Sequence, residues 1–265
     1  MNNVTMYILT HKKFDYDAIE EKEMYKPLLC GSIDLNDDYG YICDDAGKKN
    51  ISNLNKYYAE LTGEYWAWKN DDSDIIGFCH YRRYFVKNIW LNKLSKKDIL
   101  EILANCDIIL PQKTYLHKTN IEQIESSHLK FNFPAKKDDY VLLRKIIAKE
   151  SPEYLESFDE VLNEKEVYTN NMFICRKEIA NDYFNWLFSI LKIFETQTDF
   201  SQYDEGNTRV LGYLSELLLN IYVKKHKLVV NERYLLLSEL RIPILSIFGK
   251  KSPYLQKFFN FLLNK

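Results

Sequence analysis

Glycine and proline are scarce in this sequence, with 8 and 6 among 265 residues. No glycine-rich phosphate-binding fingerprint occurs, so neither a Rossmann dinucleotide site nor a P-loop is indicated. No apolar run reaches the roughly 18 residues that a membrane-spanning helix needs. Neither sign of charge dominates: 36 basic against 38 acidic residues give a net charge of −2, which gives no support for general nucleic-acid binding.

The cysteines are scattered singly along the chain, at Cys30, Cys43, Cys79, Cys106 and Cys175. The sequence contains no CxxC pair, which would suggest a zinc site, and no secretory signal, which would suggest disulfides. We therefore expect free thiols in a reducing cytoplasm.

Aromatic residues are abundant instead, with 20 Tyr, 15 Phe and 4 Trp. They suit the stacking of sugars or nucleobases, but they also fill cores. At 46% hydrophobic and 28% charged residues, the composition is typical of a globular protein with a substantial core.

One segment combines an apolar run with a cluster of charge. Residues 75–79 have the pattern of a buried strand, and His80, Tyr81, Arg82 and Arg83 follow it directly. Unpaired guanidiniums cannot be buried, so we expect the arginines where the strand leaves the core, facing solvent, a carboxylate or a phosphate. Their planar forks bind oxyanions through two hydrogen bonds. The alternative is that one arginine pairs with a structural carboxylate and the other is solvated.

The first strand, residues 4–9, also ends in polar residues, Thr10, His11 and Lys12. Ligands of open α/β sheets gather at the carboxyl ends of strands, so a nucleotide could bind here. Taken alone, His11 and Lys12 fit an ordinary surface better than a binding site.

The remaining chain alternates between strand and helix patterns. Such alternation predicts an α/β fold with a largely parallel sheet. We expect helices over residues 53–70 (capped by Ser52), 94–103, 138–149, 154–162, 179–194 and 211–226, and strands over 26–33, 75–79, 107–111, 168–175 and 228–230.

Three loops carry further candidates. Asp44 and Asp45 could bind a divalent cation or could simply be solvated. His128 lies in a polar and aromatic region over residues 114–133, where it reads as a surface histidine. The loop over 202–209 contains Asp204 and Glu205.

Several blocks, in this order, resemble the bacterial capsular and exopolysaccharide glycosyltransferases with an HYRRYF signature, a family long catalogued as a domain of unknown function. The YWAWKN and HYRRYF blocks are specific, and the resemblance covers about residues 4–240. The matching residues are Thr10-His11-Lys12, Asn50-Ile51-Ser52 with Asn55, Leu61-Thr62 with residues 65–70, Gly77 with residues 80–85, residues 107–111, residues 171–174, residues 212–216 and Leu218-Leu219-Asn220.

The resemblance implies a GT-A-like fold and a sugar-nucleotide-dependent transferase. GT-A enzymes usually place an Asp-x-Asp motif, which holds Mn²⁺ or Mg²⁺, at the end of a central strand. This sequence has His80-Tyr81-Arg82-Arg83 there instead. The arginines can neutralise the diphosphate leaving group without a metal. Alternatively, His80 with Asp44, Asp45 or Glu205 could form a metal site.

The resemblance also implies roles for individual residues. Thr10, His11 and Lys12 would line the nucleotide pocket, with Asn50, Ser52 and Asn55 nearby. Residues 80–83 would face the diphosphate and the donor sugar, while His128 and Asn171 would contact the acceptor. His80, Asp204 and Glu205 are the catalytic candidates; if the enzyme inverts configuration, Asp204 or Glu205 would be the general base. If it retains configuration, no such base is needed.

The C-terminal end, residues 241–265, predicts a basic amphipathic tail after a GT-A-like domain over residues 1–240. It has no acidic residue and carries five basic ones, and its aromatic and leucine residues from 254 onward follow helical spacing. Such a tail suits an anionic membrane surface. A terminal helix that packs on the domain or on a partner subunit is the alternative.

Together these observations predict a cytoplasmic glycosyltransferase attached peripherally to the inner face of the membrane. It would move a hexose, with galactopyranose or galactofuranose as candidates, from a nucleotide donor, expected to be UDP-linked, to a lipid-linked polysaccharide acceptor. No required cofactor is expected, although Mn²⁺ or Mg²⁺ stays open. The alternative is a non-catalytic carbohydrate- or nucleotide-binding partner in polysaccharide assembly.

Overall fold

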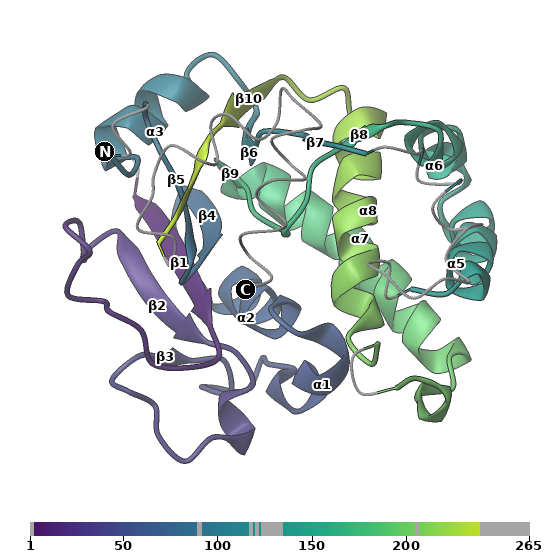
Figure 1. Ribbon diagram of the computed structural model, residues 1–265, viewed down its shortest axis with the longest axis horizontal. Helices are drawn as coiled ribbons and strands as arrows, with labels where there is room; N and C mark the ends of the chain where they lie inside the picture. The colour runs from purple at the N-terminus through teal and green to yellow at the C-terminus, as the bar shows by residue number, and fades with distance from the viewer. Residues whose placement is uncertain are drawn as a thin grey trace, which may run out of the picture.

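The computed structural model describes residues 3–88, 92–116, 119, 122, 135–204 and 207–238. Its centre is a nine-stranded sheet with the order β10-β6-β9-β4-β1-β2-β3, from which β5 and β11 branch beside β4 (Figure 1). The strands are β1 (Val4–Thr10), β2 (Tyr25–Leu29), β3 (Ile42–Cys43), β4 (Ile75–His80), β5 (Arg83–Phe85), β6 (Ile108–Pro111), β9 (Ile174–Arg176), β10 (Val230–Arg233) and β11 (Leu235–Leu237).

The sheet is mostly parallel, as the sequence predicts. Strands β3, β2, β1 and β4 form one parallel set, and β6 and β10 pair parallel to each other. Strand β9 is antiparallel to both β4 and β6, and β5 is antiparallel to β4. A separate two-stranded sheet joins β7 (Thr114–Tyr115) to β8 (Glu166–Val167). Every residue of β1 is buried, which is expected of a central strand covered on both faces.

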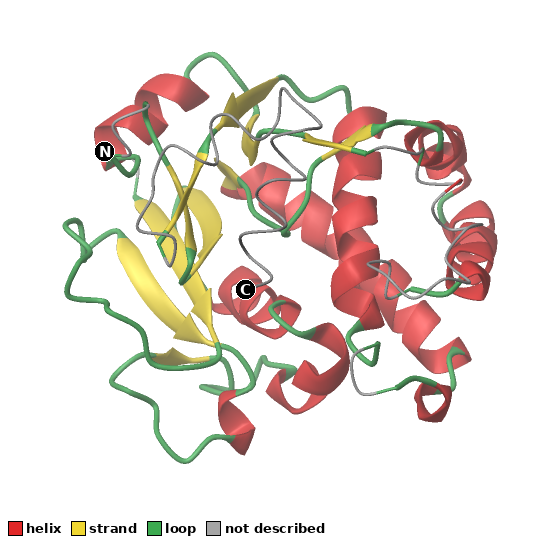
Figure 2. Ribbon diagram, in the orientation of Figure 1, coloured by secondary structure: helices red, strands yellow, loops and turns green. Residues whose placement is uncertain are grey.

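Side chains alternate along β1 and so enter two different cores. Tyr7 and Leu9 pack with the large helical layer, whereas Met6 and Ile8 face the opposite side. Figure 2 shows most helices gathered beside the sheet. The helices are α1 (Asn55–Tyr58), α2 (Leu61–Asn70), α3 (Lys96–Leu103), α5 (Lys137–Glu150), α6 (Leu155–Leu162), α7 (Lys177–Gln197) and α8 (Val210–Lys225), with short 3₁₀ turns η1 (Ser32–Asp34), η2 (Ser52–Leu54), η3 (Pro152–Tyr154) and η4 (Phe200–Gln202).

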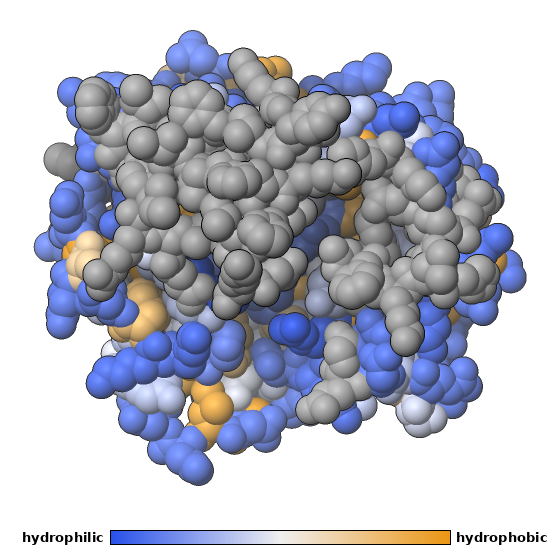
Figure 3. Space-filling model, in the orientation of Figure 1, coloured by the Kyte–Doolittle hydropathy of each residue, from blue (hydrophilic) through white to orange (hydrophobic). Residues whose placement is uncertain are grey.

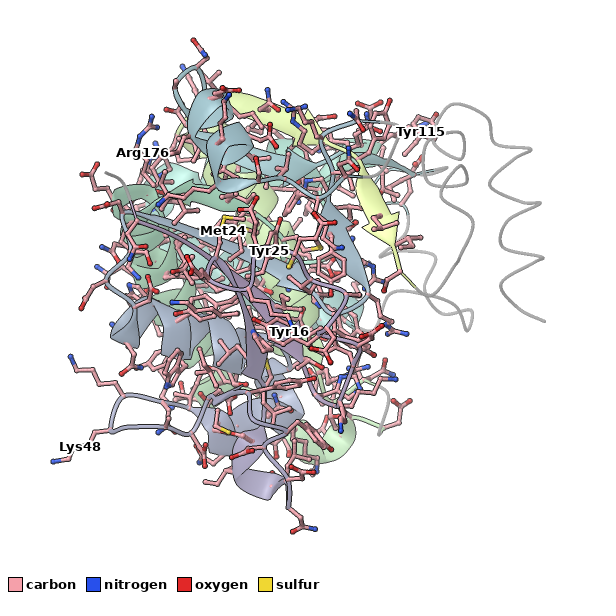
Figure 4. The ribbon with its side chains drawn as sticks, turned by 90° about the vertical axis from the view of Figure 1, so that its left-hand side faces the viewer. Tyr16, Met24, Tyr25, Lys48, Tyr115 and Arg176 are labelled. Atoms are coloured by element: carbon pink, nitrogen blue, oxygen red, sulfur yellow. The ribbon has the colours of Figure 1, made fainter. Side chains whose placement is uncertain are left out.

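The second face of the sheet is covered by α3 and by the loop after β1. In that loop the Tyr16 hydroxyl donates to the carbonyl of Tyr25 at 2.8 Å, and the Tyr25 hydroxyl donates to the carbonyl of Leu94 at 2.8 Å. Figure 4 shows Met24 and Tyr25 in the interior beneath this loop, while Lys48 projects into solvent. The loop therefore closes the second core without a long helix.

The helix predicted over residues 53–70 is broken in two. Ala59 between α1 and α2 has φ 51° and ψ −128°, outside the helical region. The side chain of Asn55 caps the break by donating to the Ala59 carbonyl at 2.8 Å and to the Thr62 hydroxyl at 3.0 Å. Because of this break, Glu60 lies at the start of α2 at the edge of the sheet.

Close approach of α2 to the sheet depends on Gly63. A Cβ atom at this position would lie 2.6 Å from the sulfur of Cys30, so only glycine fits without a shift. None of the helices in the described ranges is long and apolar enough to cross a membrane.

Candidate active site

A pocket of about 500 Å³ opens at the carboxyl ends of β1 and β4. The two strands run parallel with Leu9 opposite His80, so the polar residues that follow them meet at one edge, as expected for open α/β sheets. The break between α1 and α2 and the N-terminal half of α8 complete the walls. The lining residues are Leu9, Thr10, His11, Cys30, Asn55, Ala59, Glu60, His80, Tyr81, Arg82, Arg83, Asn170, Arg209, Tyr213 and Glu216.

Positive charge gathers on part of this wall. Three arginines line the pocket, two from the end of β4 and one, Arg209, from the N-cap of α8. Burial, together with Lys12 and the two arginines Arg82 and Arg209, lowers the pKa of His11, so this imidazole is neutral at neutral pH. Burial and the neighbouring Arg82 also lower the pKa of Arg83. An anionic ligand would relieve this repulsion.

Two carboxylates, Glu60 and Glu216, stand on the same pocket wall. Burial and the nearby charge of Glu60 raise the pKa of Glu216 to about 7, although Arg83 and the backbone N–H of Asn170 act in the opposite direction. Glu60 is held in place by Asn171, whose amide donates to its carboxylate at 2.9 Å. Glu216 is thus poised to gain or lose a proton near neutral pH.

His80 lines the pocket and interacts with both its basic and its acidic residues, namely Arg82, Arg83 and Glu60. Its Nε2 lies 2.8 Å from the backbone carbonyl of Asn170. A carbonyl can only accept, so Nε2 carries the proton. Burial, with the help of Arg83 and Arg82, lowers the pKa of His80 against the opposing effect of Glu60. The neutral ring therefore has a lone pair on Nδ1 that can accept a hydrogen bond.

Most of the donor-site residues predicted from the sequence come together here. Thr10, His11, Asn55 and residues 80–83 all line the pocket. Lys12 does not line it, but its ammonium lies 5.2 Å from the ring of Tyr81 and it affects His11. Asn171 lies directly behind the wall, where its amide holds Glu60.

Asn50 and Ser52 lie apart from the pocket lining and hold the loop after β3. The amide of Asn50 donates to the carbonyls of Asp45 and Gly47, at 3.1 and 2.9 Å. Ser52 is fully buried, and its hydroxyl donates to Asp44 instead of capping a helix. Both residues therefore shape the loop and not the surface of the pocket.

The acidic loop candidates lie elsewhere. Asp204 is exposed and accepts a hydrogen bond from the backbone of Asn207 at 3.0 Å, outside the pocket lining. Glu205, His128 and the tail over residues 241–265 lie outside the described residues.

Sequence reasoning assigned no role to Glu60, Arg209, Tyr213 or Glu216. A signal was present in α8, which is apolar almost throughout. Arg209, Tyr213, Glu216 and Asn220 stand at helical spacing on one face of that helix. Polar residues in a buried helix are informative because burying them is costly.

The described residues do not offer a site for the divalent metal that GT-A enzymes usually carry. The buried carboxylate of Asp44 already accepts from the backbone N–H groups of Gly31 and Ser32 and from the hydroxyls of Ser32 and Ser52, at 2.5 to 3.0 Å. Asp45 accepts from Ser32 at 2.7 Å. Within the described ranges no three His, Cys, Asp or Glu residues cluster in a way that could hold a metal ion.

Much of the described surface in the view of Figure 3 is hydrophilic. In the pocket, polar groups from separate parts of the chain converge on one cavity. Its polar residues come from strands, from a helix break and from α8. Such a cavity, with few convergent polar groups and a carboxyl of shifted pKa, is typical of a ligand-binding or catalytic site.

Comparison with known proteins identifies the family of the chain. A family model described as a domain of unknown function (DUF4422) matches residues 5–227. Among solved structures, the apo structure of WbbM, a bifunctional glycosyltransferase, is similar, with 30% sequence identity and a TM-score of 0.79. The match covers 89% of this chain and 45% of that one, so this chain spans less than half the length of WbbM. No curated protein matches the chain.

Proposed function

Because the chain belongs to the DUF4422 family and is similar to part of a bifunctional glycosyltransferase, we propose that it is a nucleotide-sugar-dependent glycosyltransferase. The observation that carries the proposal is that arginines and carboxylates share one pocket at the ends of β1 and β4. A nucleotide sugar has the matching chemistry, since its diphosphate suits arginine forks and its hydroxyl groups suit carboxylates.

The arginines would bind the donor diphosphate. Arg82 and Arg83 follow the central strand, and Arg209 adds a third guanidinium from α8. Fixed positive charge stabilises the negative charge that develops on the leaving diphosphate as the glycosidic bond breaks. Thr10 and His11 would line the nucleotide, with Tyr81 beside them and with Lys12 close to the Tyr81 ring.

The carboxylates would act on the sugars. In an inverting transfer the acceptor oxygen forms a bond to the anomeric carbon while the bond to the diphosphate breaks, and the diphosphate leaves with the electron pair. Glu216 would take the proton of the acceptor hydroxyl, because a general base works best with a pKa near the operating pH. In a retaining transfer, Glu60 and Glu216 would bind sugar hydroxyls instead. In either case Nδ1 of His80 would accept a hydrogen bond from substrate.

We propose that the transfer does not require a metal ion. The support is the chemistry of the pocket wall, where guanidiniums stand at the end of β4 in place of an Asp-x-Asp pair. The carboxylate of Asp44, considered from the sequence as a metal ligand, accepts four hydrogen bonds from Gly31, Ser32 and Ser52.

The finer assignment rests on the sequence resemblance. It favours a UDP-linked hexose, with galactopyranose or galactofuranose as candidates, and a lipid-linked acceptor in capsule or exopolysaccharide synthesis. Residues 1–240 would form the transferase domain, and residues 241–265 would attach it to the inner face of the membrane. Asp204 does not line the proposed donor site.

A panel of nucleotide sugars tests the proposal. The true donor should raise the melting temperature, because a ligand that binds the folded state stabilises it. The stabilising compound should then be hydrolysed slowly even without acceptor. Stabilisation without any hydrolysis or transfer would favour a nucleotide- or carbohydrate-binding partner protein, and no stabilisation by any nucleotide sugar would overturn the proposal.

A further inference from the structure

Residues Asn170 and Asn171 form a turn with an uncommon backbone. Their φ angles are 76° and 48°, so two consecutive non-glycine residues occupy the left-handed region. Asparagine tolerates this region better than most residues, but the conformation still costs free energy and persists only where the surroundings enforce it. The turn leads from β8 towards β9 at the wall of the pocket.

Helix α8 enforces the turn from two sides. The amide of Asn171 donates to the carbonyl of Gly212 at 2.9 Å. Further along the helix, Asn220 accepts from the backbone N–H of Tyr168 at 2.9 Å and donates to its carbonyl at 2.8 Å. These contacts fix the loop on the same helix that carries Glu216.

The turn contacts all three titratable groups that the proposed chemistry uses. The Asn170 carbonyl accepts from His80 Nε2, and its N–H faces the carboxylate of Glu216. Asn171 donates to Glu60 Oε1 at 2.9 Å. The turn therefore donates to both acids and accepts from the imidazole, so that the histidine carries a proton on Nε2. The Asn170 carbonyl raises the pKa of His80 against the larger lowering by burial.

Other charged or titratable groups also face His80, Glu60 and Glu216 and act on them electrostatically. They are Arg82 and Arg83 from the β4–β5 connection, Tyr140 from α5, which faces Glu216, and buried Cys30 and Glu64, which face Glu60. Among them, Arg83 interacts electrostatically with all three groups, whereas the turn adds a hydrogen bond to each one.

We infer that the Asn170-Asn171 turn is a positioning element of the active site and that Asn171 is its key side chain. The inference rests on the proposed transferase function for its kinetic consequence, but not for its structural one. By holding Glu60 and the backbone that contacts His80 and Glu216, Asn171 fixes the geometry in which these groups meet the sugars. Misplacement of such groups by about 1 Å can reduce turnover by about 100-fold.

Asn171→Gly and Asn170→Gly form a matched pair. Both keep a residue that accepts positive φ. Asn170→Gly retains the backbone contacts to His80 and Glu216 and removes only a side chain that donates to Thr169, so the His80 tautomer should stay as in the wild type and kcat should fall less than in Asn171→Gly. Asn171→Gly removes the hydrogen bonds to Glu60 and Gly212 and should lower kcat for UDP-galactose hydrolysis about 10- to 100-fold.

Asn171→Asp provides a signature that a merely structural role would not give. Its carboxyl can donate to Glu60 only while protonated and repels it when ionised. The ratio of its kcat to the wild-type kcat should therefore rise as the pH is lowered from about 8 to about 5.5, near the range in which coupled carboxyls titrate. A ratio that does not vary with pH would overturn the inference. This test does not depend on the Asn171→Gly variant, so it holds even if that variant fails to fold.

Nitrogen NMR of His80 separates this inference from the proposed function. In the wild type and in Asn170→Gly, His80 should be the Nε2–H tautomer, and in Asn171→Gly or Asn171→Asp it should become a mixture of tautomers. A pure Nε2–H tautomer in every variant would overturn the inference. A wild type that hydrolyses no nucleotide sugar would overturn the proposed function alone, because the tautomer is measured without substrate.

Discussion

The hydroxyl of Ser52 donates to the carboxylate of Asp44 at 2.5 Å, with both residues completely buried. This contact joins η2 to the loop after β3 and completes a set of four hydrogen bonds to Asp44. Ser52 and Asp44, which the sequence analysis considered for nucleotide and metal binding, thus hydrogen-bond to each other in the protein interior. The pocket beside them takes its charge from other residues.

Activity should persist in excess EDTA. The expected reason is that arginines, and not a metal ion, neutralise the leaving diphosphate. The measurement is donor hydrolysis or transfer with and without chelator, after dialysis against EDTA. Complete loss of activity with recovery on adding Mn²⁺ would show that a metal is required and that the ligands must be sought beyond the described residues.

Replacing Arg82 or Arg83 by Ala should lower kcat/KM about 100-fold, the typical effect of removing one group that stabilises developing negative charge. Lysine at either position should restore only part of the activity, because it lacks the planar fork. The control is Arg144→Ala, which removes an exposed ion pair with Asp159 at 2.6 Å between α5 and α6. Wild-type kinetics in both pocket variants would rule out their role at the diphosphate.

Glu216→Gln should reduce kcat about 100-fold or more if Glu216 is the general base of an inverting transfer. In the wild type, kcat/KM should rise with pH through about 7, the pKa of Glu216, as the carboxyl loses its proton. This rise should be absent in the variant. The comparison is Asp204→Asn, which alters the exposed acid that the sequence suggested as the base. A large loss in Asp204→Asn with normal Glu216→Gln kinetics would reverse the assignment.

Glu64→Gln should make the folded state more stable than that of the wild type at neutral and alkaline pH. Burial raises the pKa of Glu64 well above 4.5, and within the described chain its Oε1 has no hydrogen-bond partner. The folded state therefore keeps a proton that the unfolded state releases, so wild-type stability falls as the pH rises above the unfolded pKa towards the folded one. Glutamine is neutral throughout and avoids this loss.

The measurement is the difference in melting temperature between Glu64→Gln and the wild type, which should be more positive at about pH 8 than at about pH 4.5. For a chain of this size, each kcal/mol corresponds to about 2–4 °C. Exposed Glu153→Gln serves as the control and should change the melting temperature little at either pH. An equal difference at both pH values would contradict a protonated Glu64.

Truncation after Leu240 should weaken binding to anionic vesicles while nucleotide binding is retained. Each Lys or Arg near such a surface contributes about 1 kcal/mol, and the tail has five of them and no acid. High salt should detach the intact protein, because it screens exposed charges. Unchanged vesicle binding, or unfolding of the shortened chain, would instead identify the tail as a packed structural element.

The sequence by itself determined the two central strands and the position of the charged residues directly after each of them. Residues 4–9 and 75–79 are short, largely apolar runs, which are typical of strands buried on both faces. The polar residues directly after them had to leave the core, since burying unpaired charge is prohibitive. The family resemblance predicted His11, Arg82 and Arg83 at one site, and the structure brings them together because both strands of a parallel pair end at the same edge.

Only the tertiary structure decided which residues complete that site. The left-handed backbone at Ala59 breaks a helix that its periodicity predicts as continuous, and so Glu60 reaches the pocket. Glu216 arrives from a helix more than a hundred residues away, and its pKa depends on burial and on Glu60. Such effects arise from distance and desolvation in the folded chain, which local pattern does not encode. For the same reason Ser52, which has the sequence of a helix cap, became the partner of a buried carboxylate.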